Sequence, residues 1–81
     1  MPPSNAQRFK ATIAAVLGID ADEVTDALTP DHVDTWDSLN HINVISALEQ
    51  EFGVMLPTAS IGGAQSIPVL KTLLVEYGIE L

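Results

Sequence analysis

The sequence predicts an all-α fold: a small antiparallel four-helix bundle with three main helices, one short helix, and a long loop between helices one and two. Three segments carry apolar residues at the helical spacing of three or four positions, and each lies between a good helix cap and a glycine. No segment shows the clear alternation of apolar and polar residues that a half-buried strand requires. Short links between the later helices favour antiparallel packing.

The first helix is expected to begin at about Ser4 or Asn5 and to end at Leu17, because Gly18 is a natural helix stop. Its apolar residues fall on one side: Ala6, Phe9, Ile13, Val16 and Leu17. Residues 19–36 then form an acidic connection, and a loop of this length in a small domain is usually functional. We expect a short helical turn over residues 22–28 and three apolar anchors that hold the loop to the core: Ile19, Val24 and Leu28.

The second helix should begin near Ser38, with Asp37 as its N-cap, and end at Phe52 before Gly53. Its predicted core face consists of Ile42, Val44, Ile45, Leu48 and Phe52. His41 also falls within the arc of this face. Leu39 projects to the other side, above Asn43, Ser46 and Gln50. An apolar side chain placed there is of the kind that a partner protein could contact.

A short helix is expected over residues 59–65, with Thr58 as its cap and Ile61 as a core residue, although Gly62 and Gly63 weaken it. The last helix should begin at the cap Ser66, tolerate Pro68 in its first turn, and end at Gly78. Its expected inner face consists of Ile67, Val69, Leu70, Leu73, Leu74 and Tyr77. Residues 1–81 therefore form a single domain.

Composition narrows the choice of partners. The chain has no cysteine, so it has no disulfide and no thiol of its own. Eleven acidic and three basic residues give a formal net charge of −8, which disfavours nucleic acid and anionic membranes and suits partners with basic surfaces. There is no apolar run long enough to span a membrane, and residues 1–4 do not resemble a secretory signal. We expect a cytoplasmic monomer.

No metal site is predicted. Asp20, Asp22 and Asp26 resemble part of a calcium loop, but Val24 interrupts the ligand alternation and neither the turn glycine nor the final glutamate follows. The two histidines of the chain have no third ligand at a recognised zinc spacing.

No catalytic residue is predicted either, although Asp37, Ser38 and His41 supply the three residue types of a hydrolytic triad. The aspartate directly precedes the serine, His41 should point toward the core, and no G-x-S-x-G motif occurs. We interpret His41 as a partly buried histidine hydrogen-bonded to the long loop, and Trp36 as a side chain that packs this loop against the helix. A serine hydrolase remains the remote enzyme alternative.

Ser38 is the main candidate site. Its hydroxyl should lie at the start of a helix, where unpaired N–H groups and the helix dipole favour an anion. A phosphodiester on this hydroxyl would therefore be well placed. A modified serine explains the exposed hydroxyl, the acidic surroundings and the lack of catalytic machinery together.

The run Asp37-Ser38-Leu39, followed by Ile42, Ile45, residues 47–49 and residues 52–54, resembles the signature of the acyl carrier protein family. The resemblance covers roughly residues 9–77. The length of the chain, its acidity and the order of its expected helices also match this family. It implies that Ser38 carries 4′-phosphopantetheine, installed from coenzyme A by a phosphopantetheinyl transferase. The thiol of this arm would hold an acyl group as a thioester, and the protein itself would not be an enzyme.

By the same resemblance, Asp37 would cap the helix and help to present Ser38 to the transferase. The docking ridge for partner enzymes would consist of Leu39, Asn43, Ser46 and Gln50. These partners would be an acyl-activating ligase, an acyltransferase or a ketosynthase, as in fatty acid or polyketide biosynthesis.

The sequence also departs from the fatty-acid carriers. Their second helix is strongly acidic soon after the serine, whereas Asn40, His41 and Asn43 occupy that stretch here. Residues 59–64 lack the acidic side chains common in the third helix, and Trp36 replaces a residue that is often glycine. These differences favour a discrete carrier in a specialised pathway over the housekeeping one. An aminoacyl or peptidyl carrier, or an unmodified acidic helical adaptor, remains an alternative.

Overall fold

The computed structural model describes residues 3–56 and 66–81, and this part of the chain is all-helical. It contains three α-helices, α1 (Asn5–Leu17), α2 (Ser38–Phe52) and α4 (Ile67–Glu76), and a 3-10 turn, η1 (Ala21–Glu23). No strand occurs within these two ranges, so the predicted all-α class is confirmed. The short helix expected over residues 59–65, with Thr58 and Ile61, lies outside the described residues, and the count of four helices is therefore not confirmed.

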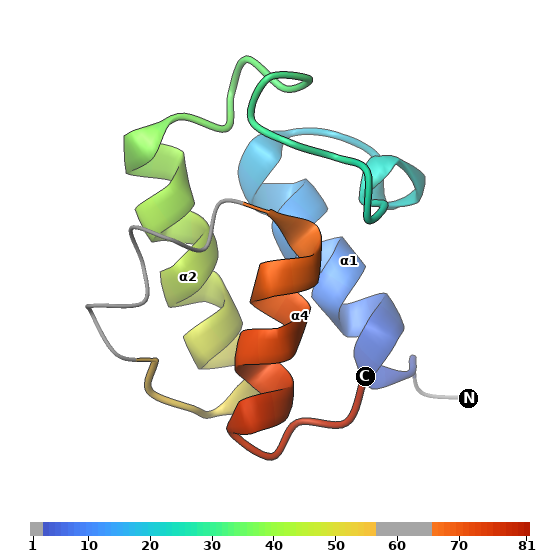
Figure 1. Ribbon diagram of the computed structural model, residues 1–81, viewed down its shortest axis with the longest axis vertical. Coiled ribbons are helices and arrows are strands. Elements are labelled where there is room, and N and C mark those ends of the chain that lie inside the picture. Colours follow the sequence, from blue (N-terminus) through green and yellow to red (C-terminus); the bar gives the residue numbers. More distant parts are fainter. Residues whose placement is uncertain (1–2, 57–65) are drawn as a thin grey trace.

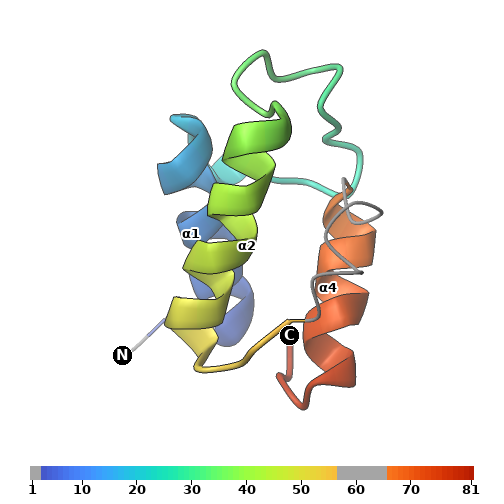
Figure 2. The same cartoon turned by 90° about the vertical axis from the view of Figure 1, so that its left-hand side faces the viewer.

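The three helices enclose one core, with the long loop across one end (Figure 1). Helix α1 packs against α2 and against η1, and α1 and α2 run in opposite directions. Helix α4 runs in the same direction as α2, as Figure 2 also shows. Both α2 and α4 begin at the end of the molecule where the long loop lies, so these two helices are parallel. The expected antiparallel order of all helices is therefore not confirmed.

Local capping explains where the helices begin and end. Ser4 and Gln7 form a capping box at the start of α1: the Ser4 hydroxyl accepts from the Gln7 N–H at 3.2 Å, and the Gln7 side chain accepts from the Ser4 N–H at 2.9 Å. Gly18 and Gly53 end α1 and α2 in the left-handed conformation, with φ of 71° and 66°. Ser66 caps α4 as predicted, accepting from the Val69 N–H at 3.3 Å.

The core draws apolar side chains from all three helices and from the loop. The innermost residues are Phe9, Ile13 and Leu17 of α1, Val44, Ile45 and Leu48 of α2, and Ile67, Leu70 and Leu74 of α4. The capping and the apolar spacing predicted from the sequence thus agree with the observed packing of the bundle.

Ile42 is not a core residue, contrary to the prediction from helical spacing. Its side chain is 50% exposed, whereas Val44, Ile45 and Leu48 are almost fully buried. At about 100° per residue, the direction of Ile42 lies well to one side of the mean direction of these three, toward Leu39. The apolar arc of α2 is therefore wider than the strip that the core covers.

Three further side chains predicted to face inward are exposed. Ala6 lies in the first turn of α1, at the helix end, and Val69 lies far around α4 from the line of Leu70 and Leu74. Tyr77 is 41% exposed because α4 ends at Glu76, one residue before it, and Tyr77 itself is the C-cap.

The loop of residues 19–37 is held to the core by more side chains than expected. Of the predicted anchors, Val24 is buried, while Ile19 and Leu28 pack against the core from partly buried positions. Val33 and Trp36 are also buried. The expected turn over residues 22–28 is shorter and lies earlier, as the single 3-10 turn η1. In the described part of the chain, none of the helices has the length and apolar character needed to cross a membrane.

Candidate functional site

Ser38 is the first residue of α2 and is exposed, as the sequence predicted. Asp37 before it is the N-cap in an extended conformation, and its carboxylate accepts from the Asn40 N–H at 2.8 Å. The Asp37 carbonyl accepts from the His41 N–H, also at 2.8 Å, which begins the helical ladder. The serine hydroxyl therefore lies at a helix N-terminus, where the partial positive charge of the helix favours a negatively charged group.

Behind this turn, Trp36 and His41 form a buried pair. The two side chains are 3% and 2% exposed, and the indole Nε1 donates to the imidazole Nδ1 at 3.1 Å. Because an indole N–H can only donate, Nδ1 is the acceptor. This confirms that Trp36 packs the loop against the helix and that His41 is hydrogen-bonded to the loop. His41 is, however, more deeply buried than predicted.

The arrangement does not form a hydrolytic triad. His41 Nδ1 is bound to Trp36 inside the core, whereas Ser38 is exposed. The Asp37 carboxylate caps α2 instead of orienting the imidazole.

A second set of hydrogen bonds ties the start of α2 to α1. The Thr35 hydroxyl donates to the Leu17 carbonyl at 2.7 Å, at the end of α1. The Thr35 carbonyl in turn accepts from the Asn40 side-chain amide at 2.7 Å. Thr35 and Asn40 were not among the site residues predicted from the sequence. The sequence signal that could have identified them is their position on either side of the Asp37 cap. Threonine and asparagine side chains bond readily to nearby backbone groups.

The side chains predicted to form a docking ridge are exposed. Leu39 is 68% exposed, and Asn43, Ser46 and Gln50 are exposed at successive turns of the same side of α2. Ile42 extends this surface beside Leu39. From Ser38 to Leu48 the helix carries no Asp, Glu, Lys or Arg, so this surface is uncharged.

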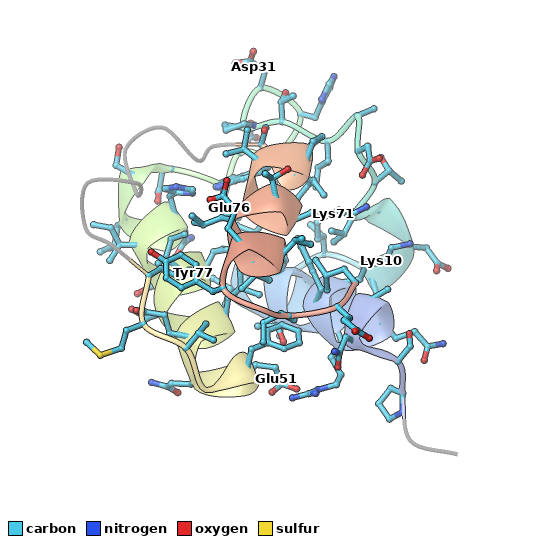
Figure 3. The ribbon with its side chains drawn as sticks, turned by 60° about the horizontal axis from the view of Figure 1, so that its bottom comes forward. Lys10, Asp31, Glu51, Lys71, Glu76 and Tyr77 are labelled. Carbon is cyan, nitrogen blue, oxygen red and sulfur yellow. The ribbon has the colours of Figure 1, made fainter. Side chains whose placement is uncertain are left out.

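The acidic side chains gather elsewhere, mainly on the loop. Asp26 pairs with Lys71 of α4 at 2.7 Å, which links the loop to the last helix. Figure 3 shows Asp31 at one end of the molecule and Glu51 at the other, with Lys10 and Lys71 on one side of α4 and Tyr77 on the other. No group of three or more candidate metal ligands occurs in the described ranges.

An open hollow of about 640 Å³ lies between α1 and α2. Its lining includes the small residues Ala11, Ala15 and Ala47 and the charged residues Arg8 and Glu51. This hollow was not predicted from the sequence, since it depends on which small residues of the two helices face one another.

A model of the phosphopantetheine attachment site family matches residues 7–74, from α1 through the loop and α2 into α4. The chain belongs to the acyl carrier protein family. 4′-Phosphopantetheine is covalently attached to domains of this family, so it is the cofactor of this carrier protein. Family members are in general carriers and not catalysts.

The geometry of the carrier protein is compatible with such an arm. Ser38 is exposed at a helix N-terminus, so a phosphodiester there would remain in solvent while it interacts favourably with the helix dipole. The neighbouring polar groups of Asp37 and Asn40 are bonded to each other, so an arm on Ser38 need not displace these contacts. No side chain has to leave the core to make room.

Proposed function

We propose that Ser38 is the residue that carries the phosphopantetheine arm and that residues 1–81 act as a discrete acyl carrier domain. The observation that supports this proposal best is the exposure of Ser38 on the first turn of α2, directly after the Asp37 cap. A hydroxyl at this place is accessible to a transferase, and the helix start stabilises the negative charge of the product.

The attachment is a transfer of the phosphopantetheinyl group from coenzyme A. The Ser38 oxygen forms a bond to the phosphorus that bears pantetheine, the bond between this phosphorus and 3′,5′-ADP breaks, and the serine proton passes to a base on the transferase. The chain contributes an oriented hydroxyl and the electrostatic environment of the helix start. Asp37 is proposed to fix this turn and to contribute to recognition by the transferase.

When bound, the arm supplies the thiol that the sequence lacks, and an acyl group is held on it as a thioester. The function is then tethering. A flexible arm keeps the acyl group at an effective concentration on the order of millimolar near each docked enzyme, without a new contact for every step.

We propose that partner enzymes dock on the exposed side of α2. The docking ridge of Leu39, Asn43, Ser46 and Gln50 lies beside Ser38, and the exposure of Ile42 adds a second apolar side chain to it. The expected partners are the phosphopantetheinyl transferase and an acyl-activating ligase, acyltransferase or ketosynthase. An apolar side chain near the arm is suited to a shallow pocket on such an enzyme.

A specialised pathway is favoured over housekeeping fatty acid synthesis. The uncharged surface of α2 between Ser38 and Leu48 supports this, since a basic enzyme patch would find no acidic partner there. An aminoacyl or peptidyl carrier is the second candidate, because the same uncharged surface and the same attachment chemistry would serve it equally well.

Intact mass measurement tests the attachment. The purified chain is incubated with coenzyme A and a broad-specificity phosphopantetheinyl transferase, and a single adduct of phosphopantetheine mass is expected. Ser38→Ala should abolish the adduct, whereas Ser4→Ala, which alters an exposed serine at the start of α1 and outside the docking ridge, should leave it unchanged. An unaltered chain that gains no mass would favour the unmodified adaptor instead.

The cargo class is tested on the modified chain. Incubation with panels of acyl-activating and aminoacyl-activating enzymes and ATP should give a further mass increase that hydroxylamine, which cleaves thioesters, removes. Loading by fatty or other carboxylic acids alone would support the acyl carrier, and loading by amino acids alone would support the second candidate.

A further inference from the structure

We propose that Trp36 is a positioning residue for the attachment reaction: its hydrogen bond to His41, together with those that Thr35 makes to Leu17 and Asn40, holds Ser38 in the orientation that the transferase requires. The inference rests on the proposed role of Ser38 as the attachment residue. It assigns a purpose to a buried polar pair that the attachment chemistry itself does not use.

Ser38 needs such support because of where it lies. It is the first residue of α2, and first turns of helices fray readily. The Asp37 cap joins residues within this turn, but it does not connect the turn to the rest of the molecule. Without another constraint, the serine hydroxyl would occupy a range of positions relative to the bundle.

Trp36 supplies one such constraint from inside the protein. Its indole is buried, and its N–H reaches His41, five residues later and a full turn into α2. The two rings also pack at a centroid distance of 6.2 Å. The segment between these two anchors contains only Asp37, Ser38, Leu39 and Asn40, so fixing its ends limits the movement of the serine between them.

Thr35 supplies the second constraint, toward α1. Its hydroxyl donates to the Leu17 carbonyl, and its own carbonyl accepts from the Asn40 side chain, each at 2.7 Å. Asn40 therefore bonds to the loop on one side through its side chain and to Asp37 through its backbone N–H. The turn that presents Ser38 is thus fixed both to the core of α2 and to the end of α1.

Loss of the hydrogen bond between Trp36 and His41 should affect mainly the attachment step. Removing the indole N–H would take from His41 Nδ1 its bond to Trp36 at a buried position, and the loop would shift to compensate. Misplacing a reacting group by about 1 Å can cost up to about 100-fold in rate, so we expect a loss of roughly tenfold in kcat/KM for the transfer. Binding to the transferase should change less than kcat, because the docking ridge remains exposed.

The test uses Trp36→Phe, which keeps an aromatic ring and removes only the N–H donor. Arm transfer by a broad-specificity transferase is followed by intact mass, with kcat and KM resolved, at a temperature where all variants are folded. Ile13→Val, a substitution in the fully buried core of α1, is the control for loss of stability alone. Amide hydrogen exchange in the unmodified protein provides a readout that does not depend on the transferase.

The proposal predicts that Trp36→Phe lowers kcat for arm transfer about tenfold and speeds exchange at the amides of Asn40 and His41, which both donate to Asp37, while Ile13→Val does neither. Equal transfer rates in the two variants would overturn the positioning role and leave the attachment at Ser38 intact. If Trp36→Phe does not fold, Thr35→Val should lower kcat and Thr35→Ser, which retains the hydroxyl, should preserve it; equal rates in this pair would overturn the proposal as well. An unaltered chain that accepts no arm would overturn both the function and this inference.

Discussion

Arg8 of α1 holds the last turn of α2 through two contacts with Glu51. Its Nη2 donates to the Glu51 carbonyl at 2.6 Å, and its Nε donates to the Glu51 carboxylate at 2.8 Å. The guanidinium also lies 4.9 Å from the centre of the Phe52 ring. Because the last carbonyls of a helix lack intrahelical partners, Arg8 satisfies a group that the end of α2 leaves free.

Arg8→Ala should therefore destabilise the bundle. The side chains of Arg8 and Glu51 are 34% and 39% exposed, so the ion pair itself contributes little. The loss of a charged hydrogen bond to a backbone carbonyl and of the ring contact should cost about 1–2 kcal/mol in urea unfolding. Lys10→Ala, at an exposed position of the same helix, should change stability by less than about 0.5 kcal/mol. Equal effects of the two substitutions would show that the Arg8 contacts do not stabilise α2.

Gly53→Ala tests the end of the same helix. Gly53 has φ of 66°, and an added Cβ would meet no atom within 4 Å. The cost should therefore come from the backbone conformation alone, about 1–2 kcal/mol. Gly53→Asn should cost less, because asparagine tolerates the left-handed region. Thermal unfolding of both variants checks this, and a neutral Gly53→Ala would mean that α2 can end in another conformation.

Leu39→Ala should separate docking from folding. Leu39 is 68% exposed, so its truncation should change the free energy of unfolding by less than about 0.5 kcal/mol. Transfer of the arm or of cargo by partner enzymes should nevertheless slow. Leu48→Ala, on the buried side of the same helix, should cost about 2–5 kcal/mol. Transfer rates that remain unchanged in Leu39→Ala would remove Leu39 from the proposed docking ridge.

Asp37 is expected to have two separable roles. Asp37→Ala should lose about 1 kcal/mol of stability, because the Asn40 N–H loses the side-chain acceptor of the cap. Asp37→Ser retains a capping oxygen and should largely restore stability while it removes the charge. If Asp37 also contributes to recognition, Asp37→Ser should still show a raised KM for the transferase. An unchanged KM would limit Asp37 to capping.

The helix boundaries were predictable because they depend on neighbouring residues. Ser66 and Asp37 bond to N–H groups three residues away, and Gly18 and Gly53 act through their own φ angles. These are local signals that a single sequence contains. The candidate attachment site was identified in the same way, from the short run around Ser38 and the apolar helix that follows.

Depth of burial was harder to predict than helical phase. Helical spacing placed Ile42 on the apolar side of α2, but whether a neighbouring element covers it depends on packing that the pattern does not encode. Tyr77 shows the same limit at a helix end, where the chain leaves the helix before the apolar repeat stops.

Contacts between distant residues could not be predicted at all. The hydrogen bond from Thr35 to Leu17 spans 18 residues, and that from Arg8 to Glu51 spans 43. Polar residues of these types are common on any surface, so only the folded arrangement of α1 and α2 shows which of them meet. The bond between Trp36 and His41, only five residues apart, was within reach of sequence reasoning.

Peptide mapping of the modified chain identifies the residue that carries the arm. After incubation with coenzyme A and a phosphopantetheinyl transferase, the chain is digested and its peptides are sequenced by tandem mass spectrometry. We predict that the phosphopantetheine group is found on Ser38 and on no other residue. An arm located on any other side chain, or an unaltered chain that carries none, would show that Ser38 is not the attachment residue.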